Sequence, residues 1–165
     1  MREFGTRGIA LDRPAISGLN HVTLAIADVD RSVAFYCDLL GFTLRALWDA
    51  GAYVEAGALW LCLSRDEAAR KTPHADYTHI AFSVSEQAYA ALRVGIEARC
   101  TIWKDNCSEG DSLYFLDPDG HKLELHVGSL ETRLAHYRAD PVKGVAVFDG
   151  SGRALEPLEK RPPLA

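Results

Sequence analysis

The chain has no excess of basic residues and no long apolar run. Its 165 residues include 18 Lys and Arg against 23 Asp and Glu, which gives a net charge of −5. A protein that binds nucleic acid through its phosphates needs a basic face, so this balance argues against nucleic acid as the main partner. A membrane-spanning helix needs about 18 or more consecutive apolar residues, and no stretch of the sequence approaches that length. The sequence therefore predicts neither a nucleic-acid partner nor a membrane span.

Cysteine is also scarce. Cys37, Cys62, Cys100 and Cys107 show no CxxC spacing, and no secretory signal precedes them. This usage is typical of reduced thiols in a cytoplasmic protein. Hydrophobic residues make up 48% of the chain and charged residues 25%, as in ordinary soluble domains. The length predicts one domain, or two small modules that share a core.

The two ends of the chain differ in character from the middle. Near the start, "REFGTRG" and "ALD" can be encoded by adjoining restriction sites, so residues 1–13 are predicted to be vector-derived and outside the fold. Residues 151–165 end in the charged, Pro-rich "LEPLEKRPPLA" and are predicted to form a flexible tail. The domain is therefore expected over residues 14–150.

One order of elements occurs twice along the chain. Strand, helix, strand, strand, strand is predicted over residues 19–64, and the same order restarts at residue 77 after a polar segment. The predicted bounds are 19–27, 28–40 (helix), 42–48, 52–55 and 59–64, then 77–84, 85–99 (helix), 101–103, 112–116 and 122–127, with a further helix from Ser129. Two βαβββ modules, about 17–64 and 77–128, predict an α+β fold with helices outside a cup-shaped mixed sheet.

Side-chain alternation along the strands predicts which residues face the cup. In the first strand Val22, Leu24 and Ile26 are bulky and apolar and should pack against the helices, so His21 and Thr23 point the other way. The same reasoning adds these residues to the cup face: Ala25, Trp60, Cys62, Ser64, Tyr77, His79, Ala81, Ser112, Tyr114, Lys122, Glu124 and His126.

Two histidines and a carboxylate on this face are candidate metal ligands. A lone histidine on a strand is more often a hydrogen-bonded structural residue than a ligand. Here, however, His21 and His79 occupy equivalent positions in the two modules, and Glu124 shares their face. A 2-His-1-carboxylate set leaves coordination positions open for substrate. His126 also shares the face of Glu124, and a supporting role beside the site is expected for it.

Several long stretches resemble a known family. They are "LNHVTLAIAD", "AFYCDLLGF", "WDAGAYVEAGALWLCLS", "DYTHIAF", "SEGDSLYFLDPDGHKLELHVG" and "LETRL". These blocks, within about residues 16–149, are similar to the fosfomycin-resistance glutathione transferases. That family belongs to the vicinal oxygen chelate superfamily, which also includes glyoxalase I and extradiol dioxygenases. The resemblance implies a Mn²⁺- and K⁺-dependent enzyme that transfers glutathione to the epoxide of fosfomycin.

The resemblance also implies roles for individual residues. The family's metal ligands fall on His21, His79 and Glu124, the set that alternation had brought to one face. Its catalytic residues fall on Thr23 and on Tyr53, which is implicated in activating glutathione. The implied substrate-binding residues are Thr23, Trp60, Tyr77, Lys104, Ser108, Ser112, Tyr114 and Arg133. Without the resemblance, only Thr23, Ser112 and Tyr114 are supported, by the face that they share with the metal candidates.

The loop "NCSEGDS" carries hydroxyls, carboxylates and carbonyls around one glycine. Taken alone it is either a solvated loop or a cradle for a monovalent cation. The resemblance implies a K⁺ site formed by Asn106, Ser108, Glu109, Gly110 and Ser112. It also implies a homodimer, in which paired modules complete each cup. The sequence leaves open whether a module pairs with its own chain or with the partner.

Three other functions remain open at this stage. The same fold supports opening of fosfomycin with water or another thiol. A metal-free drug-binding protein of the bleomycin-resistance type shares the fold but lacks the His/His/Glu set. A purely structural βαβββ protein has no need for polar groups on the inner face of five strands.

Overall fold

A computed structural model describes residues 16–69, 72–106, 109–140 and 145–156. The chain divides into two compact units, one formed by residues 18–127 and the other by the two ends of the chain, residues 1–17 and 128–165. The segment predicted to be vector-derived, residues 1–13, lies outside the described residues. Among the described residues, no helix combines the length and the apolar character that a bilayer crossing requires.

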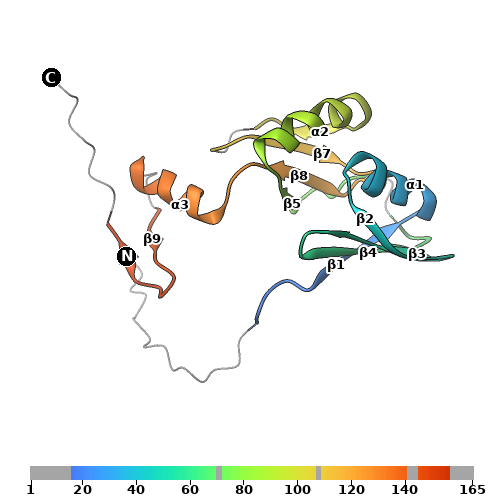
Figure 1. Ribbon diagram of the computed structural model, residues 1–165, viewed down its shortest axis with the longest axis horizontal. Coiled ribbons are helices and arrows are strands. Elements are labelled where there is room, and N and C mark those ends of the chain that lie inside the picture. Colours follow the sequence, from blue (N-terminus) through green and yellow to red (C-terminus); the bar gives the residue numbers. More distant parts are fainter. Residues whose placement is uncertain (1–15, 70–71, 107–108, 141–144, 157–165) are drawn as a thin grey trace. The chain divides into compact units, whose positions relative to one another are not determined.

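The first module of the larger unit is a four-stranded sheet with one helical segment. Its elements are β1 (His21–Ile26), α1 (Val29–Ala34), the π-helix η1 (Phe35–Leu39), β2 (Thr43–Trp48), β3 (Gly51–Ala56) and β4 (Leu59–Arg65). The strand order is β1-β4-β3-β2. Strand β1 runs parallel to β4, and the other neighbours are antiparallel (Figure 1).

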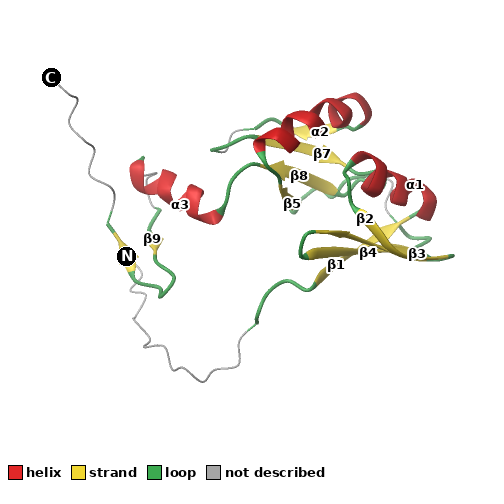
Figure 2. Cartoon of the chain, in the orientation of Figure 1, coloured by secondary structure: helices red, strands yellow, loops and turns green. Residues whose placement is uncertain are grey.

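The second module repeats this arrangement. Its elements are β5 (Ile80–Ser83), α2 (Glu86–Arg99), β6 (Ile102–Lys104), β7 (Ser112–Leu116) and β8 (Lys122–His126). The strand order is β5-β8-β7-β6, again with the first and last strands parallel. Figure 2 shows helices and strands in both modules. The predicted pair of βαβββ modules is therefore confirmed.

Side-chain caps fix where the two main helices begin. The Asp28 side chain accepts a hydrogen bond from the Arg31 amide at 2.8 Å, and Ser85 accepts one from the Ala88 amide at 3.2 Å. Such caps satisfy amides that have no partner within the helix. They place the N-cap of α1 at Asp28, the residue at which the sequence predicts the helix to begin.

The first helix does not continue as a regular α-helix to residue 40, as its pattern had predicted. The α-helix ends at Ala34, and residues 35–39 form a π-helix in which the Leu40 amide donates to the Phe35 carbonyl. The wider turn inserts one residue into the helical repeat. Gly41 then ends the segment with a φ of 79°, a conformation that glycine adopts without strain.

The strand predicted from Tyr77 is shorter than expected and begins at Ile80. The Asp76 side chain accepts a hydrogen bond from the Thr78 amide at 3.1 Å, which turns the chain before the strand. Tyr77 and His79 therefore lie in the turn that leads into β5 rather than within it.

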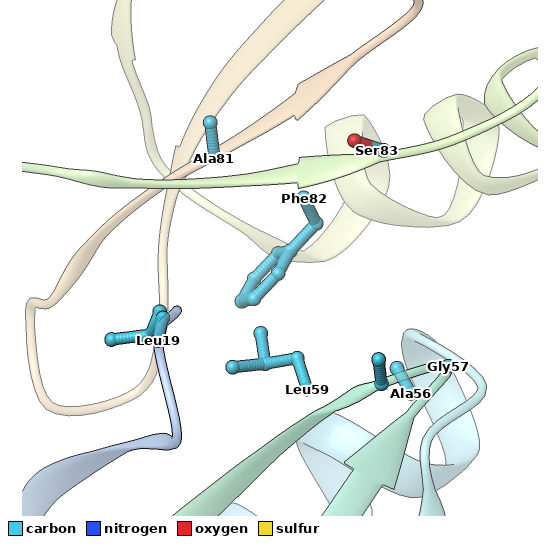
Figure 3. A pocket seen from close by; sticks show the side chains of 8 residues that line it. Leu19, Ala56, Gly57, Leu59, Ala81, Phe82 and Ser83 are labelled. Atoms are coloured by element: carbon cyan, nitrogen blue, oxygen red, sulfur yellow. The ribbon is translucent and has the colours of Figure 1, made fainter. Parts of the chain in front are cut away.

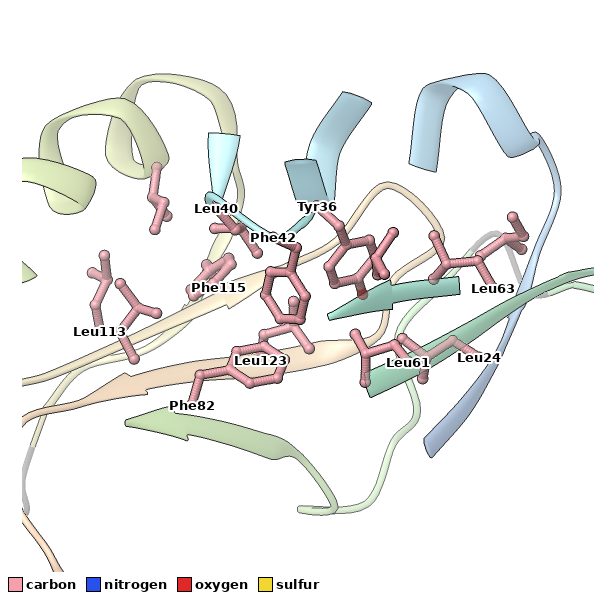
Figure 4. Close-up of a cluster of buried hydrophobic side chains, with 14 of the residues drawn as sticks. Leu24, Tyr36, Leu40, Phe42, Leu61, Leu63, Phe82, Leu113, Phe115 and Leu123 are labelled. Carbon is pink, nitrogen blue, oxygen red and sulfur yellow. The ribbon is translucent and has the colours of Figure 1, made fainter. Parts of the chain in front are cut away.

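One hydrophobic core runs through both modules of the larger unit (Figure 4). Leu61 and Leu63 from the first sheet and Leu123 from the second are fully buried in it. The rings of Phe42 and Phe82, one from each module, pack edge to face with centroids 5.4 Å apart. Burial of this apolar surface is the main source of stability that the two modules share.

A polar contact also joins the two modules. Asp117 and Asp119, in the turn between β7 and β8, are buried. Asp119 accepts hydrogen bonds from the Ala27 amide at 3.0 Å and from the Ser32 hydroxyl at 3.4 Å, and the Tyr36 hydroxyl donates to Asp117 at 2.9 Å. The second module therefore satisfies polar groups around the first helix of the other module.

The smaller unit contains α3 (Leu130–Ala139), β9 (Val147–Phe148) and β10 (Ala154–Leu155). Ser129 caps α3 in a reciprocal pair with Thr132, as the predicted start of this helix requires. The sequence analysis expected α3 to belong to one domain over residues 14–150. The larger unit ends at Val127, so α3 belongs to the smaller unit. Ala154 and Leu155 pair with β9, so this part of the predicted flexible tail forms a strand.

Candidate metal and substrate site

His79 and Glu124 form the centre of the candidate site. Nε2 of His79 lies 2.9 Å from Oε2 of Glu124, and Nδ1 of His79 lies 3.0 Å from the Tyr77 carbonyl oxygen. The carbonyl can only accept, so Nδ1 carries a proton, and Nε2 is the ring atom that faces the carboxylate. Two acceptors at this distance need a cation between them, either a proton or a metal ion.

This pair fits a divalent metal. An imidazole nitrogen and a carboxylate oxygen are both ligands that such ions accept in proteins. Neighbouring ligand atoms around an octahedral ion with bonds of about 2.1 Å lie roughly 3 Å apart. The spacing of the two atoms, 2.9 Å, matches that geometry. The carboxylate is 5% exposed, so its charge needs a partner.

The second oxygen of Glu124 is held from the neighbouring strand. Strands β7 and β8 are antiparallel, with Ser112 opposite His126 and Tyr114 opposite Glu124. The Ser112 hydroxyl donates to Oε1 of Glu124 at 2.7 Å and lies 2.8 Å from Nδ1 of His126. One carboxylate oxygen therefore faces His79 while the other is bound within the sheet.

Aromatic rings and one lysine surround His79. Its ring lies 5.2 Å from Tyr77, 5.8 Å from Trp103 and 5.9 Å from Tyr114, measured between centroids. The Lys104 ammonium lies over the Tyr77 and Tyr114 rings, at 4.8 and 4.3 Å from their centroids, and donates to the Tyr77 hydroxyl. The site thus combines a fixed positive charge with apolar walls.

The first module carries a second group of candidate residues. The His21 ring stacks on Trp60 with centroids 4.2 Å apart, and its Nδ1 lies 2.7 Å from the Asn20 side-chain oxygen. Tyr53, which is 39% exposed, packs edge to face on Trp60. Thr23 is exposed two residues along β1 from His21. This group forms an accessible aromatic face on the first sheet.

His21 does not join His79 and Glu124 within the chain. Across the residues that the structure describes, no three His, Cys, Asp or Glu side chains gather into a group that could hold a metal ion. The sequence had left open whether the modules pair within or between chains. In one chain the structure brings together two of the three predicted ligands.

The remaining candidates are distributed over the loop and the smaller unit. In the loop, the Asn106 side chain donates to the Gly110 carbonyl at 2.9 Å, and Glu109 is half-buried. Ser108 lies outside the described residues. Arg133 lies on α3, which belongs to the smaller unit.

Sequence reasoning did not select Trp103, which contacts three of the candidate residues. The pairing of β6 with β7 shifts register between Ile102 and Lys104. The shift brings Trp103 within 5.4 Å of Tyr114, ring to ring, although simple alternation assigns neighbouring residues to opposite faces. A tryptophan within the predicted strand 101–103 was the available signal.

A separate apolar groove lies between the two sheets of the larger unit (Figure 3). Its volume is about 550 Å³. Leu19, the turn from Ala56 to Leu59, and Ala81 to Ser83 on β5 line it. In Figure 3 the side chains of Leu59 and Phe82 point toward one another across this space, and Leu19 lies to one side of them.

Residues 18–125 match the model of the Glyoxalase/Bleomycin resistance protein/Dioxygenase superfamily. Together with the paired βαβββ modules, this match defines the class: the chain belongs to that superfamily, and the family resemblance seen in the sequence is confirmed.

Among curated proteins, the chain is 55% identical over 133 residues to the glutathione transferase FosA of Serratia marcescens, across 79% of this chain and 94% of that protein. It is 36% identical over 128 residues to the metallothiol transferase FosB of Staphylococcus epidermidis, across 74% of this chain and 92% of that protein.

A solved structure is also similar. It is a variant of the fosfomycin resistance protein FosX from Listeria monocytogenes, complexed with Mn(II) and 1S,2S-dihydroxypropylphosphonic acid. The TM-score is 0.64 at 29% identity, over 74% of this chain and 99% of that one.

Proposed function

We propose that the protein inactivates fosfomycin by transferring glutathione to its epoxide, with Mn²⁺ and K⁺ as cofactors. The observation that carries the proposal is the pair of half-buried His79 and buried Glu124, whose facing atoms are 2.9 Å apart, close to the aromatic rings that the Lys104 ammonium covers. Identity of 55% to a glutathione transferase supports the choice of thiol. The likeness to a Mn(II) complex at 29% identity supports the choice of metal.

His79 and Glu124 would hold the metal, together with His21. When bound, a divalent ion supplies Lewis-acid polarisation of the epoxide oxygen. The chain's own residues prepare that position. The Tyr77 carbonyl fixes the His79 tautomer, and Ser112 holds the far oxygen of Glu124.

The other candidates bind and orient the two substrates. Lys104 and the hydroxyls of Thr23 and Tyr114 are proposed to hold the phosphonate, an anion that cations and hydroxyls recognise. Ser112 would join them only by releasing its hydrogen bond to Glu124. Trp60 and Tyr77 would line the cavity, and Ser108 and Arg133 would complete the phosphonate contacts.

Tyr53 is proposed to assist ionisation of the glutathione thiol, since the thiolate is the nucleophile. The sulfur then bonds to an epoxide carbon, the carbon–oxygen bond breaks, and the oxygen takes a proton. The product is a thioether that carries a hydroxyl group.

We further propose a homodimer in which the partner subunit's His21 completes each site. Two features support it. His21 is not grouped with His79 and Glu124 in one chain. Among the described strands, β1 and β5 stand at the ends of their sheets, so each presents an edge to a further strand. The apolar groove beside β5 adds surface that association can bury.

The loop residues Asn106, Ser108, Glu109, Gly110 and Ser112 are proposed to bind K⁺. The φ of 76° at Gly110 supports a loop shaped to turn carbonyl oxygens toward one point. Since reduced glutathione is abundant in the reducing interior of the cell, the proposed activity belongs to the cytoplasm.

Product analysis tests the proposal. The protein is incubated with fosfomycin, glutathione, Mn²⁺ and K⁺, and the products are separated by mass. The expected product has the summed mass of fosfomycin and glutathione, and its formation should stop when a chelator removes the divalent ion. A diol as the main product would contradict glutathione transfer.

A second candidate activity is epoxide opening with water or another thiol. The likeness to a FosX complex with a dihydroxypropylphosphonic acid favours water, and the likeness to FosB favours another thiol. Parallel reactions without thiol, with glutathione, with L-cysteine and with bacillithiol distinguish these activities by the mass of the product.

A further inference from the structure

Ser112 lies between two side chains of the neighbouring strand. Its hydroxyl oxygen is 2.7 Å from Oε1 of Glu124 and 2.8 Å from Nδ1 of His126. Ser112 is 4% exposed and Glu124 is 5% exposed, so water has little access to either group. In the register of β7 and β8, Ser112 lies directly opposite His126. Tyr114, two residues further along β7, lies opposite Glu124.

Counting protons assigns a direction to this chain of hydrogen bonds. An ionised carboxylate can only accept, so the single hydroxyl proton of Ser112 is donated to Glu124. The Ser112 oxygen is then free only to accept along its other contact. Nδ1 of His126 must therefore carry a proton and donate it to Ser112.

The loop that precedes β7 passes close to His126. A Cβ added to Gly110 would lie 3.5 Å from Cε1 of His126 and 2.6 Å from the Val127 carbonyl oxygen. The Val127 amide also donates to the Asp111 carbonyl at 2.9 Å. Gly110 therefore lies beside the imidazole ring, and a backbone hydrogen bond joins the loop to the residue that follows His126.

We propose that His126 is a positioning residue for the metal site. Through Ser112, His126 fixes the rotation of the Glu124 carboxylate so that Oε2 faces His79 and the metal position. The inference rests on the proposed function for the metal, but the tautomer that it assigns to His126 does not. Residues that orient a metal ligand typically contribute about tenfold to a hundredfold in metal affinity.

Binding of Mn²⁺ alone tests the proposal without reference to catalysis. The dissociation constant is measured by calorimetric titration of the metal-free dimer for the wild type, His126→Ala and His126→Asn. His126→Ala should weaken Mn²⁺ binding by about tenfold or more, because Glu124 loses its fixed orientation. His126→Asn should restore most of the affinity, because its amide N–H can replace Nδ1–H. The control is His136→Ala, which removes an exposed histidine on α3.

Nitrogen-15 NMR of the metal-free wild type gives an independent reading. Nδ1 of His126 should carry a proton, and its signal should change in a Ser112→Ala variant. A proton on Nε2 instead would overturn the proposal, as would a His126→Ala variant that folds and binds Mn²⁺ like the wild type. Failure of the wild type to bind Mn²⁺ would contradict the proposed function instead. The position of the proton on His126 would then still test the hydrogen bonds that link His126, Ser112 and Glu124.

Discussion

Asp117 is a carboxyl group in surroundings that disfavour its charge. Burial raises its pKa, and this effect outweighs the opposing influence of His121, of the backbone amides and of the Tyr36 hydroxyl. Burial and the neighbouring Asp117 likewise raise the pKa of Tyr36 well above its usual range, so its hydroxyl stays protonated and continues to donate. The pair therefore acts as a donor and an acceptor with fixed roles at neutral pH.

The raised pKa makes a prediction about stability and pH. A carboxyl group whose pKa is higher in the folded protein than in the unfolded chain stabilises the fold while it is protonated. This stabilisation is complete below the unfolded pKa, and it is lost as the pH rises through the folded pKa. The Asn side chain of an Asp117→Asn variant cannot ionise, so the variant does not lose this contribution to stability as the pH rises. The free energy of unfolding of the variant relative to the wild type should therefore shift in favour of the variant as pH rises from about 3 through about 3.9, the usual pKa of aspartate, and beyond. Urea unfolding across this range measures it, and parallel curves would show that Asp117 ionises normally.

Gly110 combines a left-handed backbone with close contact to Val127, the residue that follows β8. Its φ is 76°, and an added Cβ would lie 2.6 Å from the Val127 carbonyl oxygen. Gly41 has a similar φ of 79° but nothing within 4 Å of that position. Gly41→Ala therefore incurs only the backbone cost, about 1 kcal/mol.

Gly110→Ala should lower the free energy of unfolding by about 2 kcal/mol or more, because the backbone must also move away from Val127. Comparison of the two variants by urea unfolding isolates the contact. Equal losses in Gly41→Ala and Gly110→Ala would mean that the loop relaxes freely.

At the scale of strands and helices, the turn between β7 and β8 has a role beyond reversing the chain. Asp119, with a side chain 2% exposed, accepts from the Arg31 guanidinium at 2.6 Å as well as from the Ala27 amide and the Ser32 hydroxyl. The Nε2 atom of His121 contacts the Ala25 carbonyl at 2.9 Å. This turn therefore connects the second sheet to the end of β1 and the start of α1.

Removing this carboxylate should weaken the whole larger unit. Asp119→Ala leaves the Ala27 amide and Ser32 hydroxyl without their acceptor, for a loss of about 2–4 kcal/mol. The Arg31 ion pair adds little, since that side chain is 46% exposed. Thermal unfolding measures the loss, and Asp38→Ala, at an exposed carboxylate on η1, is the control. If both variants unfold at similar temperatures, the turn does not fasten the modules.

Strands were predictable from the sequence where alternation and burial agree. The predicted bounds of β7 match the structure, and β1, β4 and β8 differ from it by a few residues at most. The start of β5 could not be predicted, because the bond from Thr78 to Asp76 competes with strand pairing. The π-helix at 35–39 was missed for a similar reason. Its hydrogen bonds are one residue longer than those of an α-helix, and the apolar pattern does not distinguish the two.

For the assembled protein, alternation placed His79 and Glu124 on one face, and the structure brings them within hydrogen-bonding distance. It could not predict that His21 stays apart, because equivalent positions in a repeat need not meet in one chain. Nor could it find Trp103, whose position depends on a register shift. The roles of these residues in catalysis stay predictions.

A mixing experiment tests whether each site contains residues of two chains. His21→Ala and Glu124→Ala dimers should each be inactive. If they are unfolded together and refolded, half of the dimers are mixed, and each has one intact site. Activity should therefore recover to about a quarter of the wild-type value in the fosfomycin assay.

The matched control is a mixture of His79→Ala and Glu124→Ala. These two residues meet within one chain, so every site in that mixture contains at least one substituted ligand. Recovery in the first mixture alone would establish the shared site. No recovery in either mixture would mean that the three ligands come from one chain.

The separation of His21 from His79 and Glu124 has a consequence for gene dosage. If complete sites exist only in dimers, their number depends on how often two chains meet. Below the dissociation constant of the dimer, it rises with the square of the chain concentration, so halving expression reduces the number of sites about fourfold. A cell that makes little of this protein would then be protected far less than in proportion to the amount it makes.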